Sequence, residues 1–528
     1  MKRILSLVLA VALCMSIVTI TATASADEEK VVTVANTAAW ESLTPMTSNR
    51  DQQVAWMYPI YESWFTLTNE GEVLPRLMES WELDPEDSHT LICHMNQAAT
   101  WSDGEKITAD DIIFTLDLES DPNLNCTQRY VVGNFIGTNA LGVREDESAE
   151  KGWKKIDDYT VSLTFKTEKA AGTVLSEVYA MRYTFTLPKH CLENIPVESV
   201  LTDSFWENPV TSGAFTVAGI ISGERIEYVA RDDYYLGRPQ MDRLIMRVIT
   251  ADNMLSAFMA GEIDTSVYGS SISYGDYELA TQMPSLVCTQ ANGFANAHIL
   301  INNQVLDKYV RLAMDCAINK QSIIDDCIYG YARPAISAIV PENPYRNQNV
   351  TGNAYDVEQA KAYLAQSSYD TTRPIKLMVT STSTLNQQIA VLVQQNLAAI
   401  GLTVSIETYD GTTVSSKLFA GDYDISIMGS ASNPFEPSES RFYFQVGSTG
   451  WLNMPDDTWE QIYDAAIDGD FEQRKAGYDI LQEKLVEEVP MIFLYHADVL
   501  FVSSDRVSNL PYASFSLKSW QYETWEVK

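Results

Sequence analysis

Four acidic residues lie within nine positions of one another, and their types and spacing could do chemistry. They are Asp103, Glu105, Asp110 and Asp111. Such a cluster could bind a metal ion or act as an acid–base pair. A calcium loop, however, needs acidic residues at alternate positions before its glycine and a glutamate well after it. The segment lacks that spacing, so we predict no metal site from it.

The same segment has the residues of a turn that leads into a helix. Ser102-Asp103-Gly104 combines a short polar side chain with a residue that is free to take positive φ. Thr108 suits the N-cap of a helix. Asp110 and Asp111 then fall in the first helical turn, where the helix dipole favours negative charge. The carboxylates are therefore predicted to be structural or solvated.

Other patterns that could support catalysis or metal binding are weak. His89, Cys93 and His94 are close in sequence, but a strand would place His94 on the opposite face from the other two. That leaves the set short of a tetrahedral metal site, and no metal or cofactor is predicted. The sequence contains neither Gly-x-Ser-x-Gly nor His-Glu-x-x-His. A pair of catalytic carboxylates among the 71 acidic residues stays open.

Length and charge restrict the class of protein. A chain of 528 residues is too long for one core, so two or three lobes are expected. The net charge of −35 disfavours binding to nucleic acid and to anionic membrane surfaces. The N-terminus has the pattern of a signal peptide ending at residue 26, with Lys2 and Arg3 before an apolar stretch and Ala24-Ser25-Ala26 as the cleavage site. We therefore expect an exported protein, in the periplasm or at the outer face of the cell membrane.

The cysteines allow two interpretations. Cys14 lies deep in the apolar stretch after Leu13, which is not the small residue that lipidation needs, so no lipid anchor is predicted. Six cysteines remain in the mature chain, and their spacing matches no zinc pattern. Cys316 and Cys327 are the closest pair that could form a bridge, and isolated buried thiols are the alternative.

Apolar periodicity predicts alternating strands and helices in at least two regions. Residues 375–380 and 402–407 read as strands on either side of a helix over 386–400 that Gly401 ends. Such a unit has parallel strands and a right-handed crossover. Similar strand and helix patterns cover 30–34, 244–249, 252–260, 263–267, 412–420, 423–428, 471–488 and 491–495.

Several segments, in order, resemble one known family. They are "LPRLMESWEL" (74–83), "TWSDGEKITADDIIFTLD" (100–117), "NPVTSGAFTV" (208–217), "RDDYYLGRPQMDRLIMRVI" (231–249), "AFMAGEID" (257–264), "VRLAMDCAINKQSIIDDCIYGYARPA" (310–335) and "GLTVSIETYDGTTVSSKLFAGDYDISIMG" (401–429). Together they are similar to the large solute-binding proteins of ABC importers, the peptide- and nickel-binding group known as solute-binding protein family 5. Each motif is weak alone, but the ordered set spans nearly the whole mature chain.

The resemblance implies a fold and a function. The fold would be α/β, a two-lobed periplasmic-binding-protein fold of class II type (cluster C) with an extra inserted domain. The expected boundaries are 27–58, 189–291 and 496–528 for lobe I, 59–188 for the inserted domain and 292–495 for lobe II. The monomeric protein would close on a peptide or small polar solute and deliver it to ABC permease subunits, without catalysis. A secreted hydrolase (glycosidase or peptidase) and a ligand-sensing receptor on the same fold are the alternatives.

Ligand-binding residues are expected in the loops at the strand ends, where α/β sheets place ligands. After the first strand, Trp40 could stack on a ligand or cover the lobe's own core, and Glu41 could accept from an amine. The other candidates outside the last loops are Tyr268, Ser270, Phe294 and Asn296. His298 alternates with apolar neighbours and is interpreted as a packed strand residue.

The segment 429–440 bears on the kind of ligand. In peptide-binding relatives this loop reads Gly-Trp-x-x-Asp, and its aspartate neutralises the α-amine of the peptide. Ser430 and Asn433 stand at the matching positions. A buried ammonium needs a carboxylate partner, so a sugar, a modified peptide or a metal chelate competes with a free-amine peptide unless Glu436 substitutes. We predict binding by Asn433, Phe435, Glu436 and, from the next loop, Trp451.

Overall fold

The computed structural model describes residues 29–47, 51–67, 73–124, 126, 129, 131–139, 141–146, 148–166, 185–267, 269–270, 272–431, 437–447, 450–467, 470–510 and 521–528. The predicted signal peptide lies outside these ranges. Within them, every helix is too short or too polar to span a bilayer.

Lobe I is built on a five-stranded sheet with the order β11-β1-β10-β9-β8. Its strands are β1 (Val31–Asn36), β8 (Phe215–Ile221), β9 (Arg225–Ala230), β10 (Arg243–Val248) and β11 (Thr265–Ser266). β1 is parallel to both β10 and β11, and α7 (Ala251–Met259) connects those two strands. The predicted βαβ unit is confirmed here, with β1 lying between its two strands. The helix α8 (Tyr274–Ala280) follows.

The inserted domain lies in the chain between β1 and β8. Its antiparallel sheet has the order β4-β5-β7-β6, formed by β4 (Met78–Asp84), β5 (Asp87–Met95), β6 (Trp153–Asp157) and β7 (Thr160–Thr164). Shorter elements before it are α2 (Asp51–Val54), β2 (Phe65–Leu67) and β3 (Val73–Pro75). The helix α3 (Ala109–Ser120) packs on the sheet, and its N-cap is Thr108, as predicted. The backbone N–H of Thr108 donates to Asp111 Oδ2 at 2.9 Å, so one carboxylate of the acidic cluster caps this helix.

Lobe II contains a six-stranded sheet with the order β14-β18-β13-β17-β15-β16. The strands are β13 (Ala295–Ile301), β14 (Ala332–Pro334), β15 (Ile375–Thr380), β16 (Val404–Tyr409), β17 (Ile425–Ala431) and β18 (Met491–Ala497). The helices are α9 (Lys308–Ala317), α10 (Lys320–Ile328), α11 (Val357–Leu364), α12 (Thr384–Ala398), α13 (Gly411–Ala420), α14 (Thr458–Ile467) and α15 (Phe471–Glu488). β15 and β16 are parallel and joined by α12, which confirms the predicted unit.

Helices cover both faces of the lobe II sheet. Along β13, Ala297, Ile299 and Ile301 belong to the core beneath α9, α10 and α12, whereas Leu300 belongs to the core beneath α13–α15. Successive side chains of a strand point to opposite faces, so a strand buried on both sides must be apolar throughout. Asn296 and His298 are the polar exceptions, and His298 is fully buried, as expected for a packed strand residue.

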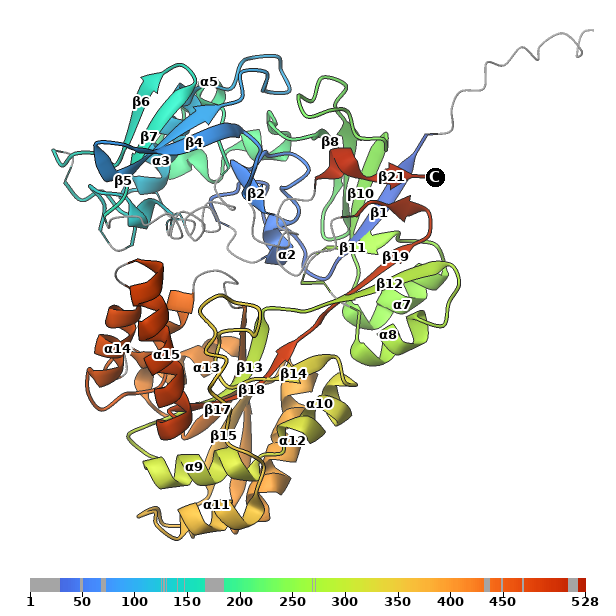
Figure 1. Ribbon diagram of the computed structural model, residues 1–528. Coiled ribbons are helices and arrows are strands. Elements are labelled where there is room, and N and C mark those ends of the chain that lie inside the picture. The colour runs from blue at the N-terminus through green and yellow to red at the C-terminus, as the bar shows by residue number, and fades with distance from the viewer. Residues whose placement is uncertain are drawn as a thin grey trace, which may run out of the picture.

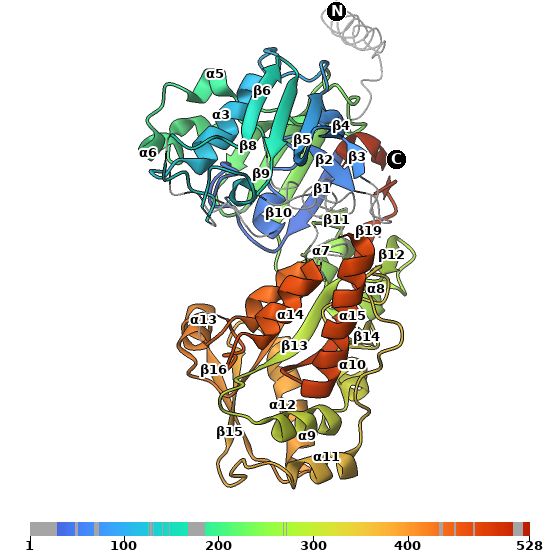
Figure 2. The same ribbon diagram turned by 60° about the vertical axis from the view of Figure 1, so that its left-hand side comes forward.

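Two chain segments that lie side by side connect the lobes, and we call the place where they pass between the lobes the crossing. β12 (Leu286–Ala291) leads into β13, and β18 leads back into β19 (Val499–Ser504), which pairs antiparallel with β12. At the crossing, a Cβ on Gly293 would lie 2.0 Å from the carbonyl oxygen of Ala497, so only glycine fits there. Lobe I and the inserted domain lie on one side of this crossing and lobe II on the other (Figures 1 and 2). The short strands β20 (Val507–Ser508) and β21 (Glu526–Val527) complete lobe I. The predicted residue boundaries of the three parts stay a prediction.

All six cysteines of the described chain are free thiols. The bridge considered between Cys316 and Cys327 is therefore wrong, and the alternative of isolated thiols holds. Cys316 on α9 and Cys327 on α10 both pack into the apolar core of lobe II. Burial raises the pKa of Cys316 to about 11, which keeps this thiol protonated.

Candidate functional site

The two large sheets point strand ends at each other. In lobe I the parallel strands β1, β10 and β11 end at one edge, and β1 runs toward α2 on the side that faces lobe II (Figure 1). In lobe II, β13 starts immediately after the crossing, and the antiparallel strands β17 and β18 end beside its first residues. We call these strand-end sides of the two sheets the lobe I edge and the lobe II edge. Both lie on the side where the lobes meet, and the loops at strand ends are where an α/β sheet binds ligands.

Asn36 organises the lobe I edge at the end of β1. Its side chain is fully buried, donates to the carbonyl of Gln52 at 2.6 Å and accepts from the backbone N–H of Ala38 at 3.0 Å. Ser270 Oγ donates to the same Asn36 oxygen at 3.3 Å and accepts from the N–H of Thr37 at 2.9 Å. The loops after β1 and β11 are thus tied together by groups that satisfy one another.

This arrangement changes the role expected for Ser270. The residue was predicted to contact ligand, but its side chain is fully buried and its hydroxyl is used within the protein. Gly269 beside it has φ +77°, and its carbonyl accepts from Gln52 Nε2 at 2.8 Å. These contacts support a positioning role for Ser270, in which the hydroxyl holds the loop in place.

Trp40 and Glu41 follow the same strand end and remain accessible. The Trp40 ring is half-buried and lies 4.7 Å from the ring of Trp56, centroid to centroid, with its other contacts at the edge of the lobe I core. Trp56 Nε1 donates to the carbonyl of Ala38 at 2.9 Å, which fixes the ring that supports Trp40. Glu41 is exposed and accepts from Gln53 Nε2 at 3.3 Å. Ligand contact by Trp40 and Glu41 stays a prediction.

Asn296 occupies the matching position on lobe II, at the start of β13. It is buried, and its amide donates to Ser430 Oγ at the end of β17 at 3.1 Å. Its Oδ1 lies 2.7 Å from Nδ1 of His298, so that nitrogen carries the proton. His298 Nε2 is then an acceptor, and it has no partner among the described residues. Burial lowers the pKa of His298 to about 3, so the imidazole is neutral at physiological pH.

His496 adds a second neutral imidazole at this edge. It pairs across the sheet with Asn296 near the end of β18 and is almost fully buried. Burial, followed by the nearby charges of Arg333 and Arg346, lowers the pKa of His496 to about 3. Its Nδ1 also lacks a partner in the described part of the chain. The lobe II edge therefore contains polar atoms that the described residues do not satisfy.

The backbone of Trp451 lies at the far end of the lobe II sheet, whereas its indole packs on Tyr443, whose ring contacts that of His298. The Trp451 carbonyl accepts from the hydroxyl of Tyr423, which precedes β17, and the carbonyl of Leu452 accepts from the N–H of Asn303, which follows β13. Both contacts are at the end of the sheet opposite Asn296. The half-buried indole packs with Phe419, Phe442 and Tyr443. Trp451 is thus part of an aromatic cluster in lobe II, and its contact with ligand stays a prediction.

Phe294 reaches between the two halves of the molecule. It lies one residue after Gly293 and is half-buried against the apolar core of the inserted domain, although the strand it precedes belongs to lobe II. Because Phe294 contacts the inserted domain while the strand after it belongs to lobe II, a movement of lobe II relative to that domain would change the surroundings of this side chain. Its predicted ligand contact is not tested by this packing.

Four predicted site residues fall outside the described residues. They are Tyr268, Asn433, Phe435 and Glu436. Ser430 belongs to the same segment, 429–440, and is described. Its hydroxyl accepts from the side-chain amide of Asn296.

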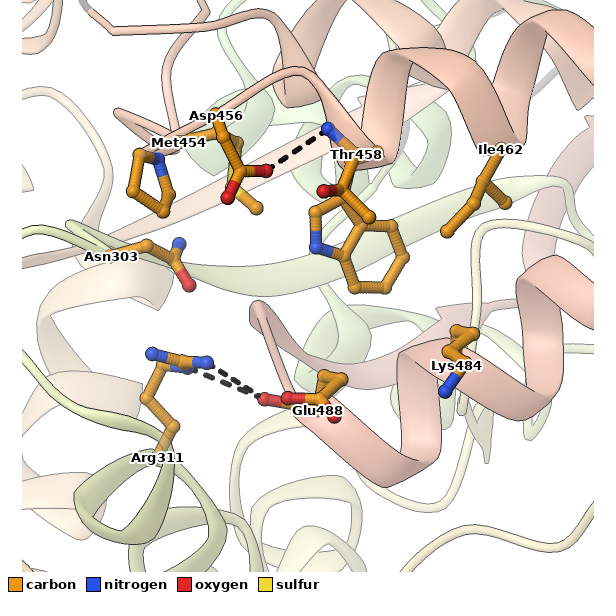
Figure 3. A pocket seen from close by; sticks show the side chains of 10 residues that line it. Asn303, Arg311, Met454, Asp456, Thr458, Ile462, Lys484 and Glu488 are labelled. Carbon is orange, nitrogen blue, oxygen red and sulfur yellow. Dashed lines mark hydrogen bonds between the residues drawn. The ribbon is translucent and has the colours of Figure 1, made fainter.

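A separate pocket of about 280 Å³ lies in lobe II between α9, α14 and α15 (Figure 3). Asn303 lines it, so it lies at the end of the sheet opposite Asn296. Arg311 in its wall donates to the carbonyls of Glu488 and Val489, which end α15. These contacts give Arg311 a structural role at a helix C-terminus, and the pocket is not part of the edge between the lobes.

Fold and site together define a two-lobed α/β binding protein with a third, inserted domain. Comparison with known proteins agrees. Residues 72–452 match the family described as "Bacterial extracellular solute-binding proteins, family 5 Middle". The match covers well over half of the chain, and the chain therefore belongs to this family.

Individual relatives are similar at low identity. The oligopeptide-binding protein AppA of Bacillus subtilis is 24% identical over 430 residues, which cover 76% of this chain and 74% of AppA. The dipeptide-binding protein of Escherichia coli is 24% identical over 450 residues, covering 81% and 82% of the two chains. The crystal structure of the ABC transporter substrate-binding protein CtaP of Listeria monocytogenes superposes with a TM-score of 0.81 at 21% identity, covering 95% of this chain and all of that one.

Sequence reasoning missed Asn36 and His496 as parts of the two edges. The signal for Asn36 was a polar residue at the end of an apolar run. His496 offered a similar signal after the apolar run 491–495. Neither pattern distinguishes a buried amide or imidazole from an exposed one.

Proposed function

We propose that this protein is the substrate-binding component of an ABC importer. It captures an oligopeptide-like or other polar solute between its lobes, and it delivers the solute unaltered to permease subunits in the membrane. The observation that carries the proposal is the family membership of residues 72–452, together with two strand-end edges that face each other beside a two-segment crossing.

The crossing supports a hinge. Only β12–β13 and β18–β19 connect the sheets of the two lobes in the described chain. Asp498 lies at this point, where its carboxylate accepts from Gln290 Nε2 at 2.7 Å and its N–H donates to the carbonyl of Tyr331 at 3.0 Å. A few residues at element ends can absorb the dihedral changes of domain closure. Ligand that contacts both edges would favour the closed form by its differential affinity.

The lobe II edge supports a polar ligand. Burying a polar atom without a partner costs roughly 1–3 kcal/mol, and His298 and His496 each have one such nitrogen. Neutral imidazole, amide and hydroxyl groups form hydrogen bonds with peptide groups and with sugar hydroxyls equally well. The relatives named for oligopeptides and dipeptides favour a peptide-like solute.

Export and the absence of catalysis complete the proposal. The family is described as extracellular, and a basic N-terminus followed by an apolar stretch and Ala24-Ser25-Ala26 supports secretion. The protein would act in the periplasm or at the outer face of the membrane. The family of substrate-binding transport proteins supports binding without turnover.

The test begins with the solute that the protein retains. Purified protein is denatured and the released small molecules are identified by mass spectrometry. Each is then added back to ligand-free protein. We expect the true solute to raise the melting temperature by mass action, to reduce the radius of gyration in solution scattering, and to be recovered chemically unchanged. Recovery of a cleaved product would instead establish the hydrolase alternative.

A further inference from the structure

A group of potential metal ligands lies outside the edges described above. Asp103, His190 and Cys191 come from two segments of the chain that are 87 residues apart in sequence, and one potential ligand atom of each lies within 4.8 Å of the others. Among the described residues, no other group of three or more histidine, cysteine or acidic side chains converges in this way. The group joins the loop before α3 of the inserted domain to the segment that returns toward lobe I.

Local contacts hold two of the three side chains in place. His190 Nε2 and Asp103 Oδ2 are 2.8 Å apart. The other oxygen of Asp103 accepts from the backbone N–H of Glu105 at 3.2 Å, which orients the carboxylate. The His190 ring lies 6.3 Å from the ring of Trp101, which is completely buried. Outer contacts of this kind fix metal ligands and determine which atoms they present.

The donor set identifies the class of ion. One imidazole nitrogen, one sulfur and one carboxylate oxygen suit Zn²⁺, whereas Ca²⁺ and Mg²⁺ take oxygen ligands. Nitrogen and oxygen ligands of a tetrahedral zinc site lie about 3.3 Å apart, so Asp103 and His190 need to separate by only about half an ångström. Their side chains are each 36% exposed, so water can supply the fourth ligand.

We propose that Asp103, His190 and Cys191 form a zinc-binding site that fastens the inserted domain to the chain segment leading back into lobe I. On binding, the thiol of Cys191 loses its proton to solvent and the sulfur coordinates the ion as a thiolate. The pattern of one carboxylate and an adjacent His-Cys pair gave no signal in the sequence, because neither segment alone has the spacing of a metal motif.

An alternative for the same residues is a reactive cysteine assisted by histidine. Burial, together with the negative charges of Asp103 and Asp111, raises the pKa of the Cys191 thiol. A reactive cysteine needs the opposite shift. The carboxylate that lies within 4.8 Å of the thiol and imidazole groups instead suits a divalent cation, so the geometry favours metal binding.

The experiment uses the full chain, purified without a polyhistidine tag and stripped with a chelator. Co²⁺ is titrated in as a spectroscopic substitute for Zn²⁺, and Zn²⁺ is then added to compete. We expect one equivalent of Co²⁺ to give a sulfur-to-cobalt charge-transfer band that Zn²⁺ abolishes. The Cys191→Ser variant should lose this band, and His190→Ala and Asp103→Asn should each weaken Co²⁺ binding by about tenfold or more.

Cys288→Ser is the matched control, because Cys288 is also a half-buried free thiol but lies in no such group. It should keep the band and the affinity. Absence of a sulfur band in the wild-type chain overturns the proposal whatever the variants do. A band that survives Cys191→Ser, or one that Cys288→Ser removes, overturns it as well.

Discussion

Two buried asparagines occupy matching positions at the facing ends of the two sheets, but their surroundings differ. Asn36 at the end of β1 is bound by Gln52, Ala38 and Ser270, so its neighbours satisfy its amide. Asn296 at the start of β13 contacts Ser430 and His298, and the contact leaves His298 Nε2 without a partner in the described chain. Among the described residues, the lobe I edge is complete and the lobe II edge contains an unused acceptor.

This difference suggests different tasks for the lobes. A fully satisfied network is rigid and holds its loops in one arrangement. A hydrogen-bond network with an unpaired atom is less stable alone. Its free energy improves more when a ligand or water supplies the missing partner. Lobe I would therefore present a fixed surface that includes Trp40, and lobe II would provide the polar groups that respond to the solute.

The largest effect should come from removing the lobe I amide. Asn36→Ala removes three hydrogen bonds at a fully buried position and leaves their partners unsatisfied. We expect the free energy of unfolding to fall by about 2–4 kcal/mol. Asn296→Ala should cost less, about 1–2 kcal/mol, because the His298 ring that it contacts already has one unpaired nitrogen among the described residues. Urea denaturation followed by circular dichroism measures both.

The control for this pair is Asn253→Ala, which alters an exposed asparagine on α7 whose amide donates to Thr250 Oγ1. Its change should stay within about 0.5 kcal/mol. If Asn296→Ala proves as costly as Asn36→Ala, the two edges are equally complete and the comparison fails.

Acid should weaken lobe II in particular. The pKa of His298 is about 3 in the folded protein, far below the ordinary value of about 6.5. Between these values only the unfolded chain binds the proton, so stability is full above about pH 6.5 and falls as the pH decreases toward 3. The slope is about 1.4 kcal/mol per pH unit for this histidine. His496, with the same low pKa, adds an equal slope.

The His298→Phe variant should lose one histidine's share of that slope, measured as unfolding midpoints in urea at several pH values from 6.5 to 4. Ile299→Val serves as the control, because it alters the adjacent buried residue of β13 and adds or removes no titrating group. The control should lower stability equally at every pH. An unchanged slope in His298→Phe would show that the imidazole is already protonated in the folded state.

The two tryptophans give a smaller contrast. Trp451 packs against three aromatic rings, whereas Trp40 packs chiefly against Trp56. Each aromatic pair contributes about 0.5–1.5 kcal/mol beyond buried area. Trp451→Ala should therefore destabilise the ligand-free protein more than Trp40→Ala, by about 1 kcal/mol.

Calorimetry of both variants, with and without solute, separates the two roles. We expect Trp40→Ala to reduce the rise in melting temperature on adding solute while the ligand-free melt stays close to wild type. A Trp451→Ala variant that melts like wild type without solute but shows no rise with it would place the Trp451 ring in the ligand site and assign the core role to other residues.

Sequence periodicity predicted the framework of both lobes well. The strand over 375–380 and the helix over 471–488 coincide with β15 and α15, because apolar spacing and glycine stops are local signals. The helix predicted over 386–400 begins two residues earlier, at Thr384, because Ser383 caps it by accepting from the N–H of Asn386. Thr108 was recognised as a cap in the same way. These features depend on neighbours in the sequence.

The site was harder to predict because it depends on contacts across the fold. Ser270 looked like a ligand-binding hydroxyl in a glycine-containing loop, yet Asn36 and Thr37, more than 230 positions away, bury and occupy it. Trp451 looked like the wall of a loop, and its aromatic neighbours from α13 and the 437–444 segment could not be read from spacing. The Asp103, His190 and Cys191 group is another case, since its members converge only through the fold.

A last prediction concerns ligand specificity and the segment 429–440. By the family resemblance, Asn433 would take the position of an aspartate in peptide-binding relatives, and Asn433→Asp replaces a neutral amide with a carboxylate of nearly the same size. Stability should hardly change. Amine-bearing peptides should bind about tenfold more tightly, which corresponds to about 1.4 kcal/mol, because a carboxylate pairs with a buried ammonium.

N-acetylated versions of the same peptides should gain nothing, and Asn253→Asp, which adds the same charge on exposed α7, should leave both series unchanged. Isothermal titration of the paired peptides measures the ratio directly. Equal gains for free and acetylated peptides would mean that the new carboxylate acts through the overall field, and Asn433 would then not be the position that recognises the amine.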